Sequence, residues 1–368
     1  MSELLETTPK QDEFYAPIES TKHVGTWMLW PHMKDNWYNN RKPARKVFAK
    51  IANTIAKYEP VKMIVNQEDY LEARAMLCAK VELIQLKYHD SWARDMAPIY
   101  LKNKNDEVRA VNFHFNTWGM QNRKSLEEWN KTWDYTIDDQ VSIDMSKNSN
   151  VDYYQAPFVL EGGSIHTDGD GTLYTTEQCL LNEERNPELN KDQIENYLKE
   201  YLNVEKVIWI PHGTYHDETK GHVDNLIHIV EPGHILLNWT DDENDPQYEI
   251  SIEAYNFLTN TTDAKGRKIK ITRLHQPTPV TIKKEEENQD ASVRFPTRVE
   301  GFRMPATYVN FYIINQAILL PIYNDEKWDQ NAIDILKECY GNRKIIPIYT
   351  RPLLLGGGNL HCITQQEL

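Results

Sequence analysis

Gly25-Thr26-Trp27-Met28-Leu29-Trp30-Pro31 is the stretch from which the fold is best inferred. Its apolar run predicts a buried strand that ends at the proline, because proline cannot donate a hydrogen bond to a sheet. Apolar residues at helical spacing follow between Arg41 and Tyr58, and a second apolar strand is expected at 61–66. We therefore interpret a helix between two strands as the structural unit of the chain.

The same alternation of strands and helices continues along the chain. We expect strands at 81–86, 111–115, 158–160, 172–175, 207–210, 226–230, 235–238, 268–274, 308–315, 317–321 and 344–348, and helices at 68–79, 188–202 and 327–339. Charged stretches at 121–150 and 283–293 are interpreted as excursions from the core, the first of them partly helical. No Pro/Ser-rich linker divides the series, so we expect a polar N-terminal tail over residues 1–12 and a single catalytic domain over residues 13–368.

The composition of the chain argues against several classes of protein. Its net charge of -14 disfavours nucleic acid and anionic membranes as partners and favours a small cationic substrate. The N-terminus lacks the basic and apolar regions of a signal peptide, and no window has the apolar length of a membrane span, so we expect a cytoplasmic protein. The 4 cysteines lie far apart without CxxC or Cys/His spacing, which indicates free thiols rather than disulfides or a zinc site.

Three consecutive glycines precede the last cysteine in Gly356-Gly357-Gly358-Asn359-Leu360-His361-Cys362. Glycine permits positive φ angles and lets another group approach the backbone closely, so this triple fits a chain that bends around a ligand. A thiol beside such a loop could be a covalent nucleophile, although a lone cysteine is more often a small buried hydrophobe. The catalytic interpretation therefore depends on partners elsewhere in the chain.

Candidate partners lie next to the predicted strands. Trp92 and Asp95 follow the strand at 81–86, in a loop type that often carries binding residues. Glu161 follows the strand at 158–160, and burying it unpaired would cost on the order of several kcal/mol, so it is either exposed or has a cationic or hydrogen-bonding partner. The two glycines after it favour a partner. His222 and Asp224 stand two residues apart, and in an extended segment they would project into one pocket while the residue between them points away.

The intervals between these candidates fit a repeated unit without proving one. Asp95 to Glu161 is 66 residues, Glu161 to His222 is 61, and His222 to Cys362 is 140, or twice 70. About five units would fit a chain of this length in a radially repeated fold, although no residue-level repeat is visible.

The candidate residues together indicate one kind of chemistry. Three acids around a thiol oppose thiolate formation, unless the substrate brings a positive charge. A guanidinium is planar and has five donors in a fixed fork, which carboxylates bind bidentately. Attack of the thiol on its central carbon, with a histidine that protonates departing ammonia and then activates water, would hydrolyse a guanidine.

Seven motifs extend this pattern in order from about residue 13 to the end. They are Trp27-Met28-Leu29-Trp30-Pro31, Asp90-Ser91-Trp92-Ala93-Arg94-Asp95, Phe115-Asn116-Thr117-Trp118-Gly119, Leu160-Glu161-Gly162-Gly163-Ser164-Ile165-His166, His216-Asp217-Glu218-Thr219, Gly221-His222-Val223-Asp224-Asn225, and Gly356 through Gln366. Together they resemble the agmatine deiminases of the guanidino-group-modifying superfamily, which are related to the bacterial-type peptidylarginine deiminases. The resemblance implies a five-bladed α/β propeller, the pentein fold, around a central active site.

The resemblance also implies an activity and a set of roles. The enzyme would hydrolyse agmatine to N-carbamoylputrescine and ammonia without a cofactor or metal, in agmatine catabolism or putrescine biosynthesis, as a homo-oligomer such as a dimer or tetramer. Carried over by position, Cys362 would form an amidino-cysteine intermediate, His222 would be the general acid and base, Asp95 and Asp224 would bind the guanidinium, and Glu161 would hold the substrate and the imidazole. Substrate binding is assigned to Trp92 over the alkyl chain, Glu218 at the distant ammonium, and Trp118, Gly356, Gly357 and Gly358 around them. We expect a largely protonated Cys362 thiol in the empty site, with a pKa that the bound cation lowers.

Two departures from the family pattern bear on the substrate. Met96-Ala97 precede Pro98 where relatives commonly have Thr-Gly or Cys-Gly, and Lys220 replaces an acidic or amide residue. The first change could alter the loop behind Asp95, and the second places a positive charge near Glu218. The alternatives are a deiminase for free or peptidyl arginine, whose carboxylate would need a cation in the free amino acid, and a catalytically silent guanidine-binding protein.

Overall fold

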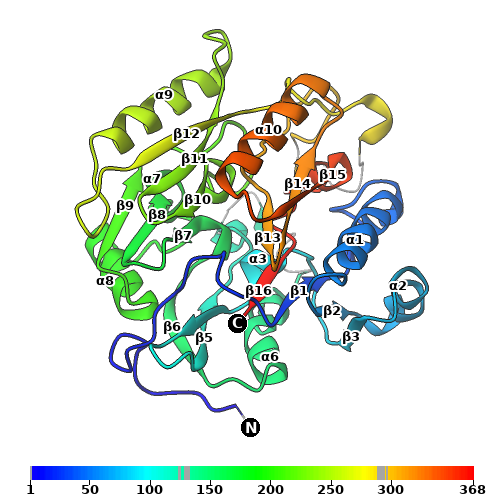
Figure 1. Ribbon diagram of the computed structural model, residues 1–368. Coiled ribbons are helices and arrows are strands. Elements are labelled where there is room, and N and C mark those ends of the chain that lie inside the picture. The colour runs from blue at the N-terminus through cyan, green and yellow to red at the C-terminus, as the bar shows by residue number, and fades with distance from the viewer. Residues whose placement is uncertain (1, 123–125, 128–132, 288–294, 296) are drawn as a thin grey trace.

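Five small sheets surround one central axis in the computed structural model of the protein (Figure 1). The structure describes residues 2–122, 126–127, 133–287, 295 and 297–368. One sheet has four strands and the others have three, and each sheet forms one blade of a propeller. The five-bladed α/β propeller implied by the sequence is therefore confirmed.

Four blades share one topology, in which an antiparallel pair of strands is followed by a helix and then by a strand parallel to the second. These blades are β4 (Ile99–Lys102), β5 (Val108–His114) and β6 (Tyr153–Val159) with α6 (Val141–Asn148); β7 (Ile165–Thr167), β8 (Thr172–Thr176) and β9 (Lys206–Ile210) with α8 (Lys191–Leu202); β10 (Ile227–Glu231), β11 (His234–Trp239) and β12 (Lys270–His275) with α9 (Pro246–Thr259); and β13 (Tyr312–Ile314), β14 (Ala317–Ile322) and β15 (Lys344–Tyr349) with α10 (Glu326–Cys339).

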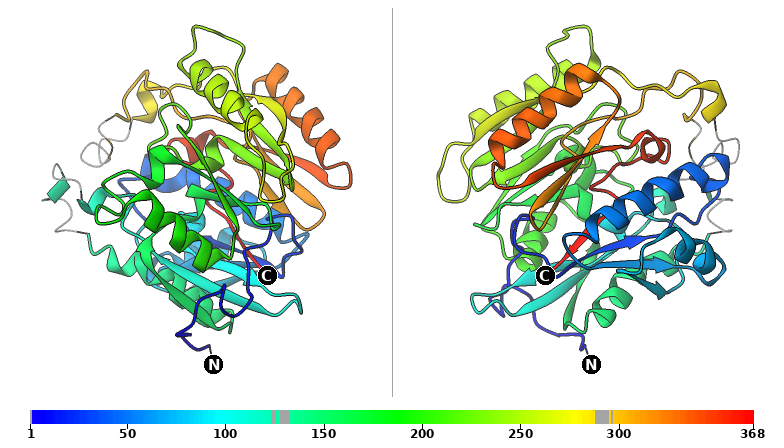
Figure 2. Two further views of the ribbon diagram at one scale, coloured as in Figure 1. Left: turned by 90° about the vertical axis from the view of Figure 1, so that its left-hand side faces the viewer. Right: turned by 45° about the vertical axis from the view of Figure 1, so that its right-hand side comes forward.

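The fifth blade joins the two ends of the chain (Figures 1 and 2). It contains β1 (Gly25–Leu29), β2 (Val61–Val65) and β3 (Val81–Gln85) in parallel, with α1 (Lys42–Ile55) and α2 (Tyr70–Met76) in the crossovers. The C-terminal strand β16 (Gln365–Glu367) pairs with β1 antiparallel, so that Gly25 faces Glu367 and Trp27 faces Gln365. This pairing closes the ring and fixes the segment just before β16 at the centre of the molecule.

Amphipathic patterns explain the helices that the sequence predicts. α1 begins with a proline in its first turn and buries Phe48, Ile51 and Ile55. α8 begins with a capping box in which Asn190 and Gln193 exchange hydrogen bonds, and it buries Ile194, Leu198 and Leu202. Trp27 and Trp30 are fully buried, as expected of core residues.

Helix α9 escaped prediction because its buried face is partly polar. α9 buries Gln247 and Ser251 beside Ala254 and Leu258, and Ser251 Oγ donates a hydrogen bond of 2.9 Å to the carbonyl oxygen of Asn238. The short strands β4 and β7 and the polar strand β16 were likewise not predicted. The strand expected at 308–315 was wrong in extent, because regular structure covers only Tyr312–Ile314.

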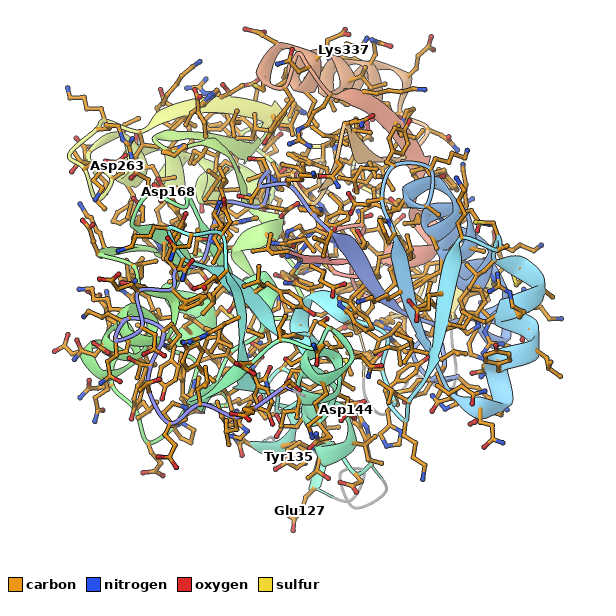
Figure 3. All side chains as sticks on the ribbon, turned by 60° about the horizontal axis from the view of Figure 1, so that its bottom comes forward. Glu127, Tyr135, Asp144, Asp168, Asp263 and Lys337 are labelled. Carbon is orange, nitrogen blue, oxygen red and sulfur yellow. The ribbon has the colours of Figure 1, made fainter. Side chains whose placement is uncertain are left out.

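The two charged stretches have little regular structure. Within 121–150 the structure has α5 (Thr136–Asp139) and α6, which confirms a partly helical stretch, but α6 buries Val141 and Met145 in its blade, so the expected excursion from the core was wrong there. Glu127, Tyr135 and Asp144 lie at one edge of the molecule (Figure 3). The stretch 283–293 begins with a short 3-10 helix, η7 (Lys284–Glu286), while residues 123–125, 128–132 and 288–294 lie outside the described part.

The polar N-terminal segment lies along the propeller. The backbone N–H of Leu5 donates to the carbonyl oxygen of Tyr153 at 2.9 Å, next to a bridge between Leu4 and Tyr153. Lys10 Nζ forms an ion pair with Glu200 Oε1 at 2.9 Å. Among the described residues, no helix is long and apolar enough to cross a membrane.

Candidate active site

The connections between consecutive blades deliver the candidate residues to the centre. Asp95 lies in α3 (Ala93–Met96) between β3 and β4, and Glu161 precedes η5 (Gly162–Ser164) between β6 and β7. His222 and Asp224 flank the start of η6 (Val223–Asn225) between β9 and β10, and Cys362 lies between β15 and β16. These four connections explain the regular spacing in the sequence.

Asn310 comes from the fifth connection, between β12 and β13, and sequence reasoning missed it. It fills the long interval between His222 and Cys362. Its Nδ2 lies 3.4 Å from Cys362 Sγ and 3.0 Å from the side-chain oxygen of Asn225, and its Oδ1 accepts from the backbone N–H of His361 at 3.1 Å. Asn310 therefore links the thiol to the backbone of the residue before it and to Asn225. Only its place in the interval of 140 residues could have indicated it.

Cys362 is a buried thiol beside a carboxylate. Its side chain lies 3.8 Å from Asp224 Oδ2, and only 7% of the residue is exposed. Burial first, and then the charges of Asp224 and Asp95, raise the pKa of Cys362 well above its ordinary value. The expected protonated thiol in the empty site agrees with this environment.

Asp95 is held by two donors from neighbouring loops. Trp118 Nε1 donates to its Oδ2 at 2.8 Å, and the backbone N–H of Gly163 donates to its Oδ1 at 3.0 Å. Burial together with Asp224 and Glu161 outweighs the imidazole of His222 and raises the pKa of Asp95 to about 6. Trp118 thus lies at the site, while its assignment to substrate binding stays a prediction.

Glu161 has the cationic partner that its sequence context led us to expect. The residue is fully buried, and its Oε1 accepts from Arg185 Nε at 3.0 Å. Burial would raise the pKa of Glu161, but Arg185 and His222 outweigh it and lower the pKa to about 2. Arg185 was not foreseen, because nothing in its surrounding sequence distinguishes it from a surface arginine.

His222 lies between two of the carboxylates. Its Nδ1 is 3.8 Å from Asp95 Oδ1, and its Nε2 is 3.7 Å from Glu161 Oε2. Burial disfavours the charged ring, yet Asp95, the Cys179 thiol and Glu161 raise the pKa of His222 well above its ordinary value. The imidazole is therefore protonated in the empty site and can act first as a general acid.

The predicted geometry of the His222 segment was wrong. We expected an extended segment, whereas Val223–Asn225 form one turn of 3-10 helix after an extended His222. Both side chains still reach one place, because a methyl group on Gly163 would lie 2.6 Å from His222 Nδ1 and 3.0 Å from Asp224 Oδ2. The same methyl would lie 2.9 Å from Asp95 Oδ1, so the lack of a side chain at Gly163 lets three functional groups meet.

Two carboxylate oxygens of the site have capacity for a cation. Asp224 Oδ1 is buried and has no hydrogen-bond partner among the residues that the structure describes. Glu161 Oε2 forms an ion pair with His222 Nε2 at 3.7 Å, and it too has no hydrogen-bond partner among the described residues. Because an unpaired buried acceptor is costly, these oxygens fit a ligand with several N–H donors and a positive charge.

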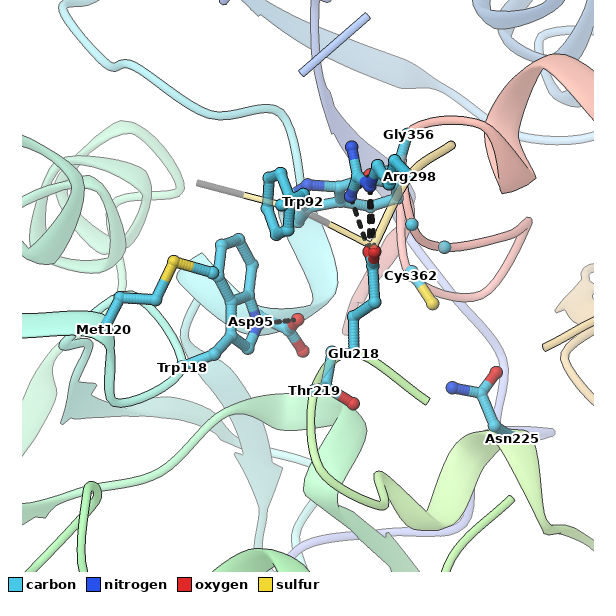
Figure 4. Close-up of a pocket in the computed structure, with 13 residues that line it drawn as sticks. Trp92, Asp95, Trp118, Met120, Glu218, Thr219, Asn225, Arg298, Gly356 and Cys362 are labelled. Atoms are coloured by element: carbon cyan, nitrogen blue, oxygen red, sulfur yellow. Dashed lines mark hydrogen bonds and ion pairs between the residues drawn. The ribbon is translucent and has the colours of Figure 1, made fainter. Parts of the chain in front are cut away.

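A cavity leads to this centre, with a volume of about 390 Å³ that includes the space open to solvent at its mouth (Figure 4). Asp95 and Trp118 lie on one side of it and Cys362 on the other, at the end of the glycine loop. Gly357 has a φ of +98°, and Trp92 packs so closely on Gly358 that a methyl there would lie 2.4 Å from its ring. These contacts show that the glycines let protein side chains of the cavity wall approach the loop closely, while close approach to a bound molecule stays a prediction.

Glu218 lines the cavity but is already paired, which the sequence did not indicate. Arg298 holds it with two nitrogens, at 2.9 Å from Nε to Oε1 and 2.6 Å from Nη2 to Oε2. Arg298 also donates to Asn36 Oδ1 at 2.8 Å and to the carbonyl oxygen of Gly356 at 2.8 Å. A substrate ammonium would therefore share Glu218 with a guanidinium instead of meeting a free carboxylate.

Neither departure from the family pattern distorts the site. Lys220 pairs with Glu184, so its charge is neutralised away from Glu218. Ala97 has a φ of -85° and a ψ of 161°, a conformation that alanine adopts readily. Both changes are therefore compatible with an intact pocket.

Two buried clusters bring possible metal ligands together in space. They are Glu161, Cys179 and His222, and Glu19, His166 and His361, each with donor atoms within 4.8 Å of one another. The guanidinium of Arg185 lies against the first cluster, and that of Arg94 lies 3.9 Å from Glu19 in the second. These positive charges disfavour a metal cation in either cluster.

Comparisons with known proteins place the chain in a family. The model of the Porphyromonas-type peptidyl-arginine deiminase family matches residues 15–367. A Mycoplasma capricolum protein, provisionally named agmatine deiminase, is 54% identical over 100% of this chain and 99% of its own length. A Vibrio parahaemolyticus protein with the same provisional name is 46% identical over 98% of this chain and 99% of its own length.

Solved structures agree with these relatives. The agmatine deiminase of Enterococcus faecalis, captured catalysing its reaction, superimposes with a TM-score of 0.91 at 36% identity, covering 100% of this chain and 99% of its own. A cysteine-to-serine variant of the C. jejuni agmatine deiminase with substrate bound gives a TM-score of 0.82 at 27% identity, covering 96% of both chains. The chain therefore belongs to the Porphyromonas-type peptidyl-arginine deiminase family.

Proposed function

We propose that this protein is an agmatine deiminase, which hydrolyses agmatine to N-carbamoylputrescine and ammonia through a covalent intermediate on Cys362. The observation that carries the proposal is the meeting of Asp95, Glu161 and Asp224 with His222 beside a buried thiol. These groups suit a planar cation with several donors. The names of the similar proteins support agmatine as that cation.

The first half of the reaction transfers the amidine to sulfur. Binding of the guanidinium releases the thiol proton, because the new positive charge offsets Asp95 and Asp224. The Cys362 thiolate then forms an S–C bond to the central guanidine carbon. His222 gives its proton to one amino group, the C–N bond breaks, ammonia leaves, and a cationic amidino-cysteine remains.

The second half of the reaction regenerates the thiol. The neutral imidazole of His222 takes a proton from water, and the resulting hydroxide bonds to the amidine carbon. The S–C bond breaks, the hydroxyl group becomes the carbonyl of N-carbamoylputrescine, and its proton returns to Cys362. The balance is one guanidinium and one water consumed, with one urea group, one ammonia and one proton formed.

A comparison of agmatine with arginine in an ammonia-release assay tests the proposal. We expect agmatine to be the better substrate, because it has no carboxylate that needs a cation. Arginine or a peptidyl-arginine peptide as the better substrate would contradict the proposal. A covalent amidino adduct on Cys362, trapped by acid and identified by mass spectrometry, would exclude a silent guanidine-binding protein.

The activity should fall on the acid side as Asp95 takes up a proton. Burial and neighbouring carboxylates raise the pKa of Asp95 to about 6, and the protonated form cannot hold a cation. We therefore expect kcat/KM for agmatine to be retained above about pH 6 and lost below it. Trp118→Phe removes a hydrogen bond that lowers this pKa, so its acid limb should lie at higher pH. A profile without an acid limb between about pH 5 and 7 would contradict the assignment.

Glu218→Gln tests how the distant end of the substrate is recognised. Removing the carboxylate leaves the buried Arg298 uncompensated in the cavity wall, so we expect KM for agmatine to rise roughly tenfold or more. The freed guanidinium should at the same time improve the relative use of arginine, whose carboxylate it can bind. Lys220→Gln is the matched control and should leave both KM values unchanged, because Lys220 pairs with Glu184. An unchanged agmatine KM in the Glu218 variant would show that the ammonium binds elsewhere.

Other properties of the protein form part of the same proposal. We propose that residues 13–368 act as one catalytic domain, and that the protein works in the cytoplasm as a dimer or tetramer. A place in agmatine catabolism or putrescine biosynthesis follows from the chemistry of the product. Light scattering of the purified protein would test the assembly.

A further inference from the structure

The two oxygens of Asp224 have different surroundings. Oδ2 lies 2.8 Å from Nδ1 of His361 and 3.8 Å from Cys362 Sγ. Oδ1 has no hydrogen-bond partner within the described part of the chain, and the residue is only 1% exposed. One oxygen is therefore fixed by the protein, while the other is available to a substrate guanidinium.

His361 is clamped between two acids on opposite sides of its ring. Besides the contact to Asp224, its Nε2 lies 2.7 Å from Glu19 Oε2. An ionised carboxylate only accepts hydrogen bonds, and a neutral imidazole has one N–H donor. With both carboxylates ionised, the two contacts are satisfied together when the ring carries two N–H groups, so this geometry favours an imidazolium.

Of the three neighbouring rings of His166, His228 and His361, it is His361 that carries a positive charge. Arg94 Nε donates to its carbonyl oxygen at 3.3 Å, and the rings of His166 and His228 lie 5.2 Å and 5.8 Å away. Burial lowers the pKa of His166 well below its ordinary value and that of His228 to about 4, so both rings are neutral. Burial and Arg94 also oppose charge on His361, but Glu19 and Asp224 outweigh them and raise its pKa.

We propose that His361, supported by Glu19, is a positioning residue that turns Asp224 so that one of its oxygens faces the substrate guanidinium. The inference deepens the proposed function, on which it rests. The imidazolium offsets one of three converging negative charges, and it occupies Oδ2 so that Oδ1 is presented to the cavity. His361 acts through Asp224 and does not touch the reacting carbon.

Two substitutions at position 361 separate the hydrogen bond from the charge. The amide nitrogen of His361→Asn takes the place of Nδ1 and can still donate to Asp224, whereas that of His361→Gln takes the place of Nε2 and faces Glu19. We expect kcat/KM for agmatine to fall about 10- to 100-fold in the glutamine variant, mainly through KM, and less in the asparagine variant. Both variants should move the acid limb of the kcat/KM profile to higher pH, because the positive charge of His361 is lost from the site.

Glu19→Gln tests the supporting residue. It keeps an acceptor for His361 Nε2 but removes the negative charge that stabilises the imidazolium. His361 should then lose its proton at lower pH, so activity should fall earlier on the alkaline side than in the wild type. Glu19→Gln should therefore shift the alkaline limit of activity, whereas the His361 variants should shift the acid limit. A loss of folded protein alone would not produce these opposite shifts.

The control is His23→Gln, a buried ring that contacts Glu59 at 3.1 Å and the backbone oxygen of Glu19 at 2.8 Å without touching Asp224. Its kinetic constants and pH limits should match those of the wild type. Two results would overturn the proposal. One is an equal loss of kcat/KM in the His23 and His361 variants with unshifted pH limits, and the other is wild-type kinetics in His361→Gln.

A labelling experiment keeps this inference separate from the proposed substrate. Cys362 alkylation is compared for chloroacetamidine, a planar cation, and chloroacetamide, its neutral analogue. We expect the wild type to prefer the cation and His361→Gln to lose about 10- to 100-fold of that preference. If the wild type fails to hydrolyse agmatine but shows this pattern, the proposed function falls and the role of His361 stands. An undiminished preference in the glutamine variant would refute that role.

Discussion

Cys362→Ser is expected to abolish ammonia release from agmatine, with a fall in kcat on the order of 10⁴-fold or more. Serine is nearly isosteric with cysteine, but a hydroxyl is far less acidic than a thiol. With Asp224 3.8 Å from the sulfur and Asp95 beside it, the site opposes an anion even for the thiol, so an alkoxide will not form. The measurement is ammonia release under saturating agmatine.

The same variant should still bind the substrate. The carboxylates that hold the guanidinium are unchanged, so calorimetry should detect agmatine binding to Cys362→Ser. Cys78→Ser is the matched control, because Cys78 is exposed and lies outside the site, and it should retain full activity. Retained turnover in the Cys362 variant would disprove covalent catalysis at this position.

Gly163→Ala is expected to disable the site without touching any of its functional side chains. The added methyl group would lie 2.6 Å from His222 Nδ1, 2.9 Å from Asp95 Oδ1 and 3.0 Å from Asp224 Oδ2. All three groups would have to move, and a displacement of about 1 Å from the productive geometry costs about 10²-fold in rate. We therefore expect kcat/KM for agmatine to fall by roughly 10²-fold or more.

Gly341→Ala provides the control for that experiment. A methyl group at Gly341 would have its nearest neighbour at 3.6 Å, so the substitution should leave both activity and thermal stability near the wild-type values. Circular dichroism of both alanine variants shows whether the propeller is intact. Near-normal activity of folded Gly163→Ala would contradict the convergence of the three groups at this glycine.

The sequence located the candidate residues of the site because each stands beside a distinctive local feature. Cys362 follows three glycines, Glu161 precedes two, and the candidates stand at strand ends with repeated intervals. Motif resemblance then assigned their roles. The structure brings them into one buried centre, which spacing alone could not demonstrate.

The residues that hold these candidates in place have no distinctive local sequence feature. Arg185, Arg298 and Asn310 look like ordinary polar residues in the sequence, and their partners lie 24, 80 and 52 residues away. The pairing of Glu218 with Arg298 changes the view of the distant substrate end, because the carboxylate expected there is already neutralised. Sequence proximity had instead directed attention to Lys220, which points to another acid.

Sequence alone determined most of the strands and helices and predicted the chemistry of the site. Periodic apolar residues encode these elements locally, and the glycine loop and the acids predict a thiol that acts on a cation. Only the tertiary structure decided how the ring closes and which groups share the centre. The polar strand β16 pairs with β1, and His361 reaches Glu19 across 342 residues. Backbone hydrogen bonds and buried ion pairs of this kind depend on distance in space, so no local pattern in the chain encodes them.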